Sequence, residues 1–271
     1  MTLKFSELLA NRWRDSNSLL CVGLDPDVSR LTSHYSPDKE GVEYFCIDIV
    51  DATAEFACAF KPQIAYFAAI GAEKQLENIC THIRANYPKI PIILDAKRGD
   101  IGDTAKMYAQ EAFDRYGAHA VTVNPYMGGD TIEPYLVHKN GAAIVLCRTS
   151  NAGSGEFQSQ IIDGEPLYKH VARRATNEWS KHGDVSLVVG ATYPEELAEV
   201  RAIVGDMPLL VPGVGAQGGD PEAVVKNGAS SNRTGLIVNS SRAILYADTS
   251  DPMSAAAAVA RKTRDTLNAY R

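Results

Sequence analysis

The stretch IPIILDAKRGDIGDT, residues 90–104, decides the fold prediction for this chain. It opens with a continuous apolar run that ends abruptly at Asp95, and a segment with helical spacing follows at 103–116. An apolar run without alternation is typical of a strand in a parallel sheet that is covered on both faces. The stretch therefore predicts a buried parallel strand, a short charged loop and a crossover helix.

The same pattern recurs along the chain. Short apolar runs that stop at polar residues, glycine or proline predict eight strands, at residues 18–25, 56–63, 90–97, 120–126, 143–150, 185–192, 208–214 and 235–241. Apolar residues three and four apart predict amphipathic helices at residues 64–87, 103–116, 166–182 and 194–205. The Asp-Pro pairs at 220–221 and 251–252 predict two further helix starts, because aspartate caps a helix and proline suits its first turn.

Eight strand-then-helix units in 271 residues predict a TIM (β/α)8 barrel, an α/β fold that forms a single domain over residues 1–271. An open, doubly wound sheet is the alternative architecture for such a pattern. The sequence contains no linker-like run of proline, glycine or serine and no low-complexity tract that would divide the chain. Its content of 45% hydrophobic residues is sufficient for one large core.

The composition limits the classes of function. A net charge of -6 argues against a broad attraction to nucleic acid or anionic membranes, although local cations could still bind a phosphorylated small molecule. No run reaches the roughly 18 apolar residues of a membrane span, and the N-terminus does not resemble a signal peptide, so we expect a cytoplasmic protein. We expect the five cysteines to be buried thiols and the six histidines to be solvated surface residues.

Polar residues at the ends of the apolar runs are the candidate site residues, because the active site of a barrel gathers at the carboxyl ends of its strands. These residues are Asp25 after the first run, Lys61 in the second, Asp95 and Lys97 in the third, Ser150 after the fifth and Arg242 after the eighth. Residues 149–157, TSNAGSGEF, could recognise a polar heterocycle, although a plain surface loop has the same composition. Asp25 precedes Pro26 and could equally be a turn residue.

The charges of the second and third runs predict a catalytic cluster. Asp95 and Lys97 are two apart on one strand, so both side chains should point to the same face, and Asp100 follows in the turn. With Lys61, two ammonium and two carboxylate groups would share a small space, which is tolerable only if the charges alternate. Such a group stabilises developing charge. The alternatives are a solvated turn after the strand and a surface lysine at position 61.

A second group of residues predicts a phosphate site. Residues 211–224, VPGVGAQGGDPEAV, contain glycines that let the backbone approach an anion, and Gln217 adds an amide donor. Arg242 would supply a bidentate cation from the loop after the eighth strand, where barrels typically bind phosphate. The alternative is a flexible glycine turn beside a surface arginine.

These residues together resemble the orotidine 5'-phosphate decarboxylase family, in its longer, type 2 subfamily, over nearly the whole chain. The most specific motif is LDAKRGDIGDT, residues 94–104; Arg98-Gly99 fills a variable pair, and Asp103 replaces an asparagine that is frequent there. The resemblance implies decarboxylation of orotidine 5'-phosphate to UMP in de novo pyrimidine biosynthesis, with no cofactor and no metal. It also implies a cytoplasmic homodimer with shared active sites and no nucleic-acid or membrane partner.

The resemblance further implies a role for each candidate residue. The catalytic set would be Lys61, Asp95, Lys97 and Asp100. Loss of carbon dioxide would leave a carbanion on the pyrimidine ring, which Lys97 would stabilise and then protonate. The substrate-binding set would be Asp25 for the ribose, Ser150 for the pyrimidine, Gln217 and Arg242 for the phosphate, and Pro212 beside them. Asp100, Ile101 and Thr104 would reach into the site of the partner subunit.

Two other functions fit the same barrel. A related sugar-phosphate aldolase would use Mg2+ and an enediolate, with the carboxylates as metal ligands, but Lys61 stands where that site needs a further acid. A catalytically inactive nucleotide-binding sensor would not need both lysines. The sequence therefore favours the decarboxylase.

Overall fold

The computed structural model of the chain describes residues 3–138, 141–214, 218–248 and 250–271. Its main sheet contains eight parallel strands in the spatial order β2-β1-β10-β9-β8-β5-β4-β3. The bounds are β1 (Leu20–Leu24), β2 (Ala59–Pro62), β3 (Ile93–Arg98), β4 (Ala120–Val123), β5 (Ala142–Arg148), β8 (Asp184–Val189), β9 (Leu209–Pro212) and β10 (Leu236–Ser240). Each lies within a predicted strand, except that β3, β5 and β8 extend one residue beyond the predicted range at one end.

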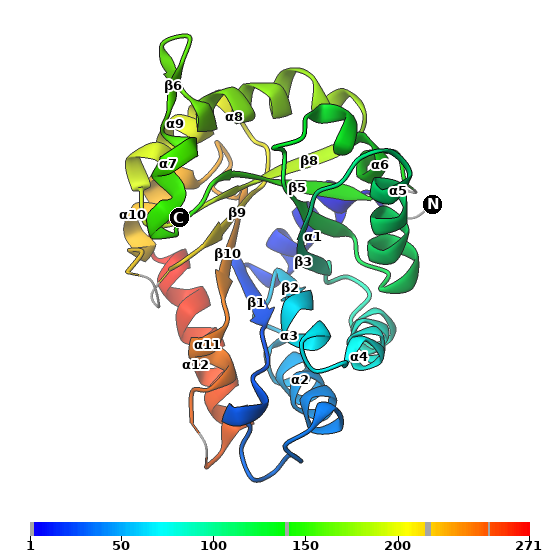
Figure 1. The fold of residues 1–271 in the computed structure, drawn as a ribbon. Coiled ribbons are helices and arrows are strands. Elements are labelled where there is room, and N and C mark those ends of the chain that lie inside the picture. The colour runs from blue at the N-terminus through cyan, green and yellow to red at the C-terminus, as the bar shows by residue number, and fades with distance from the viewer. Residues whose placement is uncertain (1–2, 139–140, 215–217, 249) are drawn as a thin grey trace.

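The sheet closes on itself between its first and last strands. Parallel bridges join Phe60 to Ile92 and Gln63 to Asp95, and the Phe60 N–H donates to the Pro91 carbonyl at 3.0 Å. The strands therefore form a nearly closed (β/α)8 barrel (Figure 1), and the open, doubly wound alternative is wrong.

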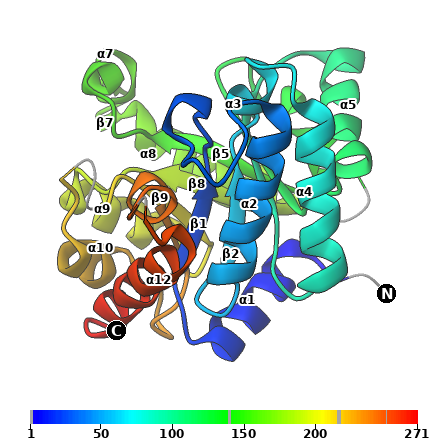
Figure 2. The same cartoon turned by 90° about the horizontal axis from the view of Figure 1, so that it is seen from below.

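Helices surround the barrel, and their apolar faces together with the buried strands form the core. The longer helices are α2 (Lys39–Thr53), α4 (Glu73–Asn86), α5 (Gly102–Gln110), α8 (Leu167–Asn177), α9 (Pro194–Val204), α10 (Pro221–Gly228) and α12 (Pro252–Asn268). Seen from below in Figure 2, α2 packs between α4 and α12. The side chains of Asp220 and Asp251 cap α10 and α12, as the Asp-Pro pairs predict.

The N-terminal helix α1 (Phe5–Ser16) covers the end of the barrel at which the strands begin. Its Trp13 donates from Nε1 to the carbonyl of Leu236, at the start of β10, at 2.9 Å. Its Arg12 donates from Nε to the carbonyl of Ala57, just before β2, at 2.8 Å. Because α1 covers this base, the opposite end, where the strands finish, remains for a site.

Some elements differ from the predictions. The predicted helix 64–87 is divided into α3 (Ile64–Ala68) and α4, since Gly71 has a φ of 65° that an α-helix does not accept. Helix α5 continues into a π-helical turn, η2 (Glu111–Arg115). The remaining short elements are η1 (Val28–Arg30), η3 (Gly129–Thr131), α6 (Glu133–Leu136), η4 (Ala152–Ser154), α7 (Gly155–Gln158), η5 (Trp179–Lys181) and α11 (Arg242–Leu245).

A hairpin that the sequence analysis did not predict projects from the barrel before α8 (Figure 1). It pairs β6 (Ile161–Ile162) with β7 (Glu165–Pro166) in antiparallel register. Asp163 and Gly164 form its two-residue turn with φ values of 49° and 84°. Two positive φ angles match the right-handed twist of the strands, and aspartate-glycine is a favoured pair for that geometry.

All five cysteines are buried, as predicted. The prediction for the histidines is wrong for His119, which precedes β4 near the base of the barrel. Its Nδ1 accepts a hydrogen bond from the Ile92 N–H at 3.0 Å, and burial, with a smaller effect from Arg84, lowers its pKa to about 4. His119 is therefore a neutral structural acceptor, since burial disfavours the charged imidazolium.

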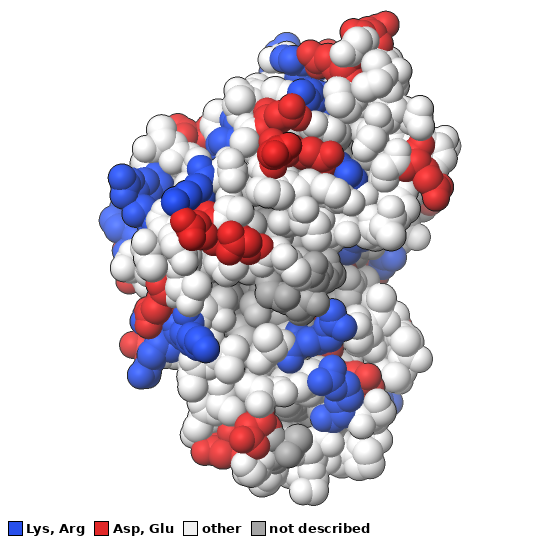
Figure 3. All heavy atoms as spheres, turned by 90° about the vertical axis from the view of Figure 1, so that its left-hand side faces the viewer, with Lys and Arg blue, Asp and Glu red and all other residues white. Residues whose placement is uncertain are grey.

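The surface carries charges of both signs. On the face shown in Figure 3, basic and acidic side chains alternate in small groups. Within the described ranges, no helix combines the length and the apolar character needed to cross a bilayer.

Candidate active site

Asp95 is the centre of a charged cluster at the carboxyl end of the barrel. Its Oδ2 accepts from Lys61 Nζ at 2.8 Å, and its Oδ1 accepts from Lys97 Nζ at 2.6 Å and from Thr122 Oγ1 at 2.9 Å. Lys61 and Asp95 are buried, whereas the side chain of Lys97 is 47% exposed. Lys61 and Asp95 therefore form the buried part of the cluster. Lys97 is its exposed part, at the end of the barrel where the strands finish, which we call the mouth.

The pKa values within the cluster favour the charged forms. Burial alone would lower the pKa of Lys61, but the carboxylates of Asp95 and Asp25 raise it above its ordinary value. Burial alone would raise the pKa of Asp95, but the two lysines lower it well below its usual range. Coulomb attraction is strong where little water screens it, so Asp95 stays ionised and Lys61 stays protonated around neutral pH.

Strand β3 is irregular at the cluster. The pairing of β3 with β4 changes register between Leu94 and Arg98. Lys97, within this interval, has a φ of 46°, which is uncommon for a residue with a Cβ. The N–H groups of Ala96 and Lys97 both donate to Thr122 Oγ1, at 3.0 and 2.9 Å. Asp95 and Lys97 do meet as predicted, but through a bulge that Thr122 supports rather than through regular strand alternation.

Thr122 is a site residue that the sequence analysis missed. It is buried in β4 and binds both the Asp95 carboxylate and the bulged backbone of β3. A signal for it existed, because Thr122 is the polar residue within the apolar run AVTV of residues 120–123. A lone hydroxyl in a buried strand needs a hydrogen-bond partner, which here is the Asp95 carboxylate of the charged cluster.

Unpartnered polar atoms lie near the ends of β1 and β10. In the described part of the chain, Asp25 Oδ1, Asn239 Oδ1 and Ser241 Oγ are buried without a hydrogen-bond partner. A Cβ on Gly23 would lie 2.8 Å from Ser241 Cβ and 3.0 Å from Asn239 Oδ1, so the glycine leaves these side chains their space. Gly23 itself is paired in register with Lys61. Buried polar atoms without partners are costly, which is typical of a site that a ligand completes.

The turn after β3 presents a third set of predicted residues. Asp100 Oδ1 accepts from the Ile101 N–H at 2.8 Å, and Ile101 and Thr104 are exposed. Among the described residues of this single chain, Asp100 makes no hydrogen bond or ion pair with Lys97. The chain by itself thus joins three of the four predicted catalytic residues.

The predicted phosphate site is partly described. Pro212 is the last residue of β9, and a parallel bridge between Val214 and Gly219 brings the two ends of the following loop together. Arg242 is exposed at the first position of α11. Gln217 lies outside the described residues.

Ser150 lies two residues beyond β5 and is half-buried. A Cβ on Gly190, which follows β8, would lie only 2.8 Å from Ser150 Cβ and 2.9 Å from Ser150 N. The two backbones therefore approach more closely than a side chain at position 190 allows.

The fold and this geometry define a class of protein: a (β/α)8 barrel with a buried Lys-Asp-Lys cluster at the carboxyl ends of its strands. A family model described as "Orotidine 5'-phosphate decarboxylase / HUMPS family" matches residues 18–259. The chain belongs to this family, as the sequence resemblance indicates.

Individual relatives agree with that assignment. The chain is 56% identical over 269 residues to a protein of Janthinobacterium sp. (strain Marseille) named orotidine 5'-phosphate decarboxylase, covering 99% of both chains. It is 58% identical over 270 residues to the protein of the same name from Ralstonia pickettii (strain 12J), covering 99% of this chain and 100% of the relative. The structure of Leishmania donovani OMP decarboxylase is similar with a TM-score of 0.85 and 37% identity, covering 98% of this chain and 99% of that one.

Proposed function

We propose that this protein decarboxylates orotidine 5'-phosphate to UMP in pyrimidine biosynthesis, in the cytoplasm and without a metal or cofactor. The observation that carries the proposal is the Asp95 carboxylate held between the ammonium groups of Lys61 and Lys97. The substrate is inferred from the family to which the chain belongs. The charged groups of the cluster suit the decarboxylation.

The reaction breaks the bond between the pyrimidine ring and its carboxylate. The electron pair stays on the ring carbon as carbon dioxide leaves, and a proton must then be added at that carbon. Lys97 suits both tasks, because its ammonium is partly exposed and carries both a positive charge and transferable protons. Preorganised charge of this kind would have to lower the barrier by roughly 20 kcal/mol together with remote binding energy.

Asp95 positions the reacting ammonium. Its Oδ1 binds Lys97 Nζ directly, while Lys61 holds the other oxygen from a buried position. The left-handed backbone of Lys97 adds a further constraint on where the ammonium can lie. Lys61 and Asp95 therefore serve as the fixed part of the machinery, and Lys97 as the part that touches the substrate.

The cluster favours this chemistry over a Mg2+-dependent aldolase. Three donors, Lys61, Lys97 and Thr122, already occupy both oxygens of Asp95. A cation would have to displace an ammonium group to bind there. The inactive-sensor alternative leaves unexplained why Lys97 adopts a strained conformation that aims its charge at Asp95.

The remaining predicted residues suit the rest of the nucleotide. The unpartnered Oδ1 of Asp25 is available to a ribose hydroxyl, and Ser150 could bind the pyrimidine. Pro212, Gln217 and Arg242 would bind the phosphate from the loops after β9 and β10. Because the phosphate would lie far from the reacting carbon, its binding energy can be used to organise the site, so a substrate without phosphate should lose turnover as well as affinity.

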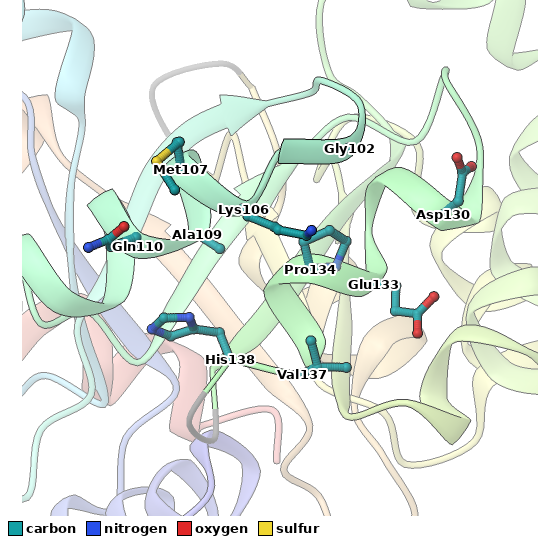
Figure 4. A pocket seen from close by; sticks show the side chains of 10 residues that line it. All are labelled: Gly102, Lys106, Met107, Ala109, Gln110, Asp130, Glu133, Pro134, Val137 and His138. Atoms are coloured by element: carbon teal, nitrogen blue, oxygen red, sulfur yellow. The ribbon is translucent and has the colours of Figure 1, made fainter. Parts of the chain in front are cut away.

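We also propose a homodimer in which Asp100, Ile101 and Thr104 complete the partner's site. Next to these residues, a groove of about 620 Å³ runs between α5 and α6 (Figure 4). The exposed apolar side chains of Met107 and Val137 line it. A second copy would remove these groups and Ile101 from water, which is favourable. Light scattering at assay concentration should give twice the chain mass; a monomer that decarboxylates the substrate at full rate would contradict the shared site.

The central experiment follows the loss of orotidine 5'-phosphate absorbance with purified protein in excess EDTA. We expect the wild type to turn over, Lys97→Ala to lose at least about 10⁴-fold in kcat, and Lys74→Ala to match the wild type. Lys74 is an exposed lysine of α4 that pairs with Glu77, so it controls for the loss of one surface charge. No turnover by the wild type would refute the proposed function, and activity abolished by EDTA would favour the metal-dependent alternative.

A further inference from the structure

Arg148, the last residue of β5, is a buried arginine that the proposed mechanism does not use. Its guanidinium reaches α9, where Nε donates to Glu196 Oε2 at 2.5 Å and Nη2 donates to Glu196 Oε1 at 3.5 Å. It also stacks over the ring of Tyr193 at 4.1 Å from the centroid. A planar fork that matches a carboxylate and an aromatic face is a geometry that lysine cannot reproduce.

The other edge of the same guanidinium binds the loop that follows β5. Nη1 donates to the Thr149 carbonyl at 3.3 Å, to Gln158 Oε1 at 3.4 Å and to Ser154 Oγ. Gln158 Oε1 in turn accepts from the Thr149 N–H at 2.8 Å, and its Nε2 donates to Thr149 Oγ1 at 2.9 Å. The beginning and the end of the loop 149–158 are therefore tied to each other and to Arg148.

Ser150 lies inside this tied loop, directly after Thr149. On its other side it packs on Gly190, whose N–H donates to the Arg148 carbonyl at 2.7 Å. Ser150 is thus held between the backbone of Gly190 and the segment that Arg148 organises. The close approach of Gly190 and the tied segment around Arg148 thus both constrain the position of this serine.

We infer that Arg148, braced by Glu196, is a positioning residue that fixes the loop 149–158 and so presents Ser150 to the pyrimidine ring. The inference rests on the proposed function, because it assumes that Ser150 binds the substrate. All three guanidinium nitrogens of Arg148 have acceptors, which compensates for burying its charge. The contacts of Arg148 with Glu196 and with the loop 149–158 therefore fix the position of Ser150 without leaving a buried charge unpaired.

A double-mutant cycle tests this role. Ser150→Ala and Arg148→Lys should each lower kcat/KM for orotidine 5'-phosphate by about tenfold, mainly through KM, because a hydrogen bond to substrate corresponds to roughly 1.4 kcal/mol. The double variant should be little worse than Ser150→Ala, because Arg148 acts through that serine. Glu196→Gln, which keeps the side-chain shape, should repeat the effect in a weaker form and serves if Arg148→Lys does not fold.

Arg201→Lys is the matched control. Arg201 is on the same helix as Glu196 but binds backbone carbonyls near the base of the barrel, so its replacement should lower thermal stability and leave kcat/KM within about twofold. Multiplicative losses in the double variant, or full kcat/KM in Arg148→Lys, would overturn the inference while leaving the proposed function intact. Absence of turnover in the wild type would overturn the proposed function instead.

A measurement that does not depend on catalysis tests the positioning role of Arg148 separately from the proposed function. Arg148→Lys should speed amide hydrogen exchange within residues 149–158, and Arg201→Lys should not. If amide exchange in this loop were the same in Arg148→Lys and in the wild type, Arg148 would not fix the loop, whatever reaction the protein catalyses.

Discussion

The two ends of the barrel use similar residues for opposite purposes. At the base, Arg201 donates to the carbonyls of Gly228 at 2.7 Å, Met207 at 2.7 Å and Gly235 at 2.8 Å, and burial lowers its pKa to about 10. At the mouth, Arg148 and Lys61 are buried beside carboxylates, and the pKa of Lys61 is raised. Carbonyl dipoles hold a cation in place, whereas full negative charges keep it charged and build an electrostatic field.

The two ends also differ in the partners of their polar groups. Asp25, Asn239 and Ser241 keep buried polar atoms without partners, and Lys97 keeps a left-handed backbone. At the base, Trp13 and His119 use their ring nitrogens to satisfy backbone groups. The comparison teaches that the unpartnered atoms at the mouth lie beside the charged cluster, where a ligand can complete them, whereas Trp13 and His119 satisfy backbone groups at the base.

The largest expected effect is at the mouth. Asp95→Asn should lower kcat at least about 10³-fold and also lower the free energy of unfolding by about 3–5 kcal/mol, because buried Lys61 loses its ionised partner. Chemical denaturation and steady-state kinetics measure the two effects. Asp103→Asn, at an exposed carboxylate on α5, should change the free energy of unfolding by less than about 0.5 kcal/mol. An Asp95→Asn protein as stable as the wild type would show that the buried pair is not a structural foundation.

The next effect is at the base and depends on pH. The folded pKa of His119 is about 4, below the ordinary value of 6.5, so the unfolded chain takes up the proton first as the pH falls. The contribution of neutral His119 to the free energy of unfolding is therefore complete above about pH 6.5 and is lost as the pH falls toward 4. Between pH 7 and 4.5 the wild type should lose about 2 kcal/mol more stability than His119→Asn, which accepts a hydrogen bond but does not titrate. Equal pH dependence of the two proteins in denaturant titrations would contradict the assignment of His119 as a half-buried neutral acceptor.

The smallest effect compares two glycines. Gly190→Ala places a Cβ about 2.8 Å from Ser150 Cβ, so we expect kcat/KM to fall by about tenfold and stability by about 1–3 kcal/mol. Gly205→Ala, at the C-terminal end of α9, meets open space but has a φ of 60°, so it should cost about 1 kcal/mol in stability and leave kinetics unchanged. Kinetics and thermal unfolding of both variants provide the measurement. If Gly205→Ala impaired kcat/KM as much as Gly190→Ala, the close approach to Ser150 would have no special role.

Much of the fold was predictable because it depends on local pattern. Continuous apolar runs predict each of the eight barrel strands, and the Asp-Pro pairs predict the starts of α10 and α12. The hairpin of β6 and β7 was missed because its two-residue strands are too short to show alternation. The break at Gly71 was missed because a glycine within an amphipathic pattern does not by itself reveal a positive φ.

The candidate site was predictable where charged residues end apolar runs, as at Lys61, Asp95 and Lys97. Thr122 and Arg148 were missed, although each is a polar residue in a buried strand. Their partners lie 27 and 48 residues away in the chain, at Asp95 and Glu196, and such pairings follow from the closed barrel rather than from spacing.

The sequence by itself determined the eight barrel strands and the placement of charges at their ends, because period and polarity are local properties of a chain. Only the tertiary structure decided that β2 and β3 meet, so that Lys61 and Asp95 form a buried ion pair. It also decided that β3 bulges at Lys97 and that Arg148 ties a loop to α9. The physical reason is that burial and Coulomb attraction depend on distances in space, which barrel closure sets between residues far apart in the sequence.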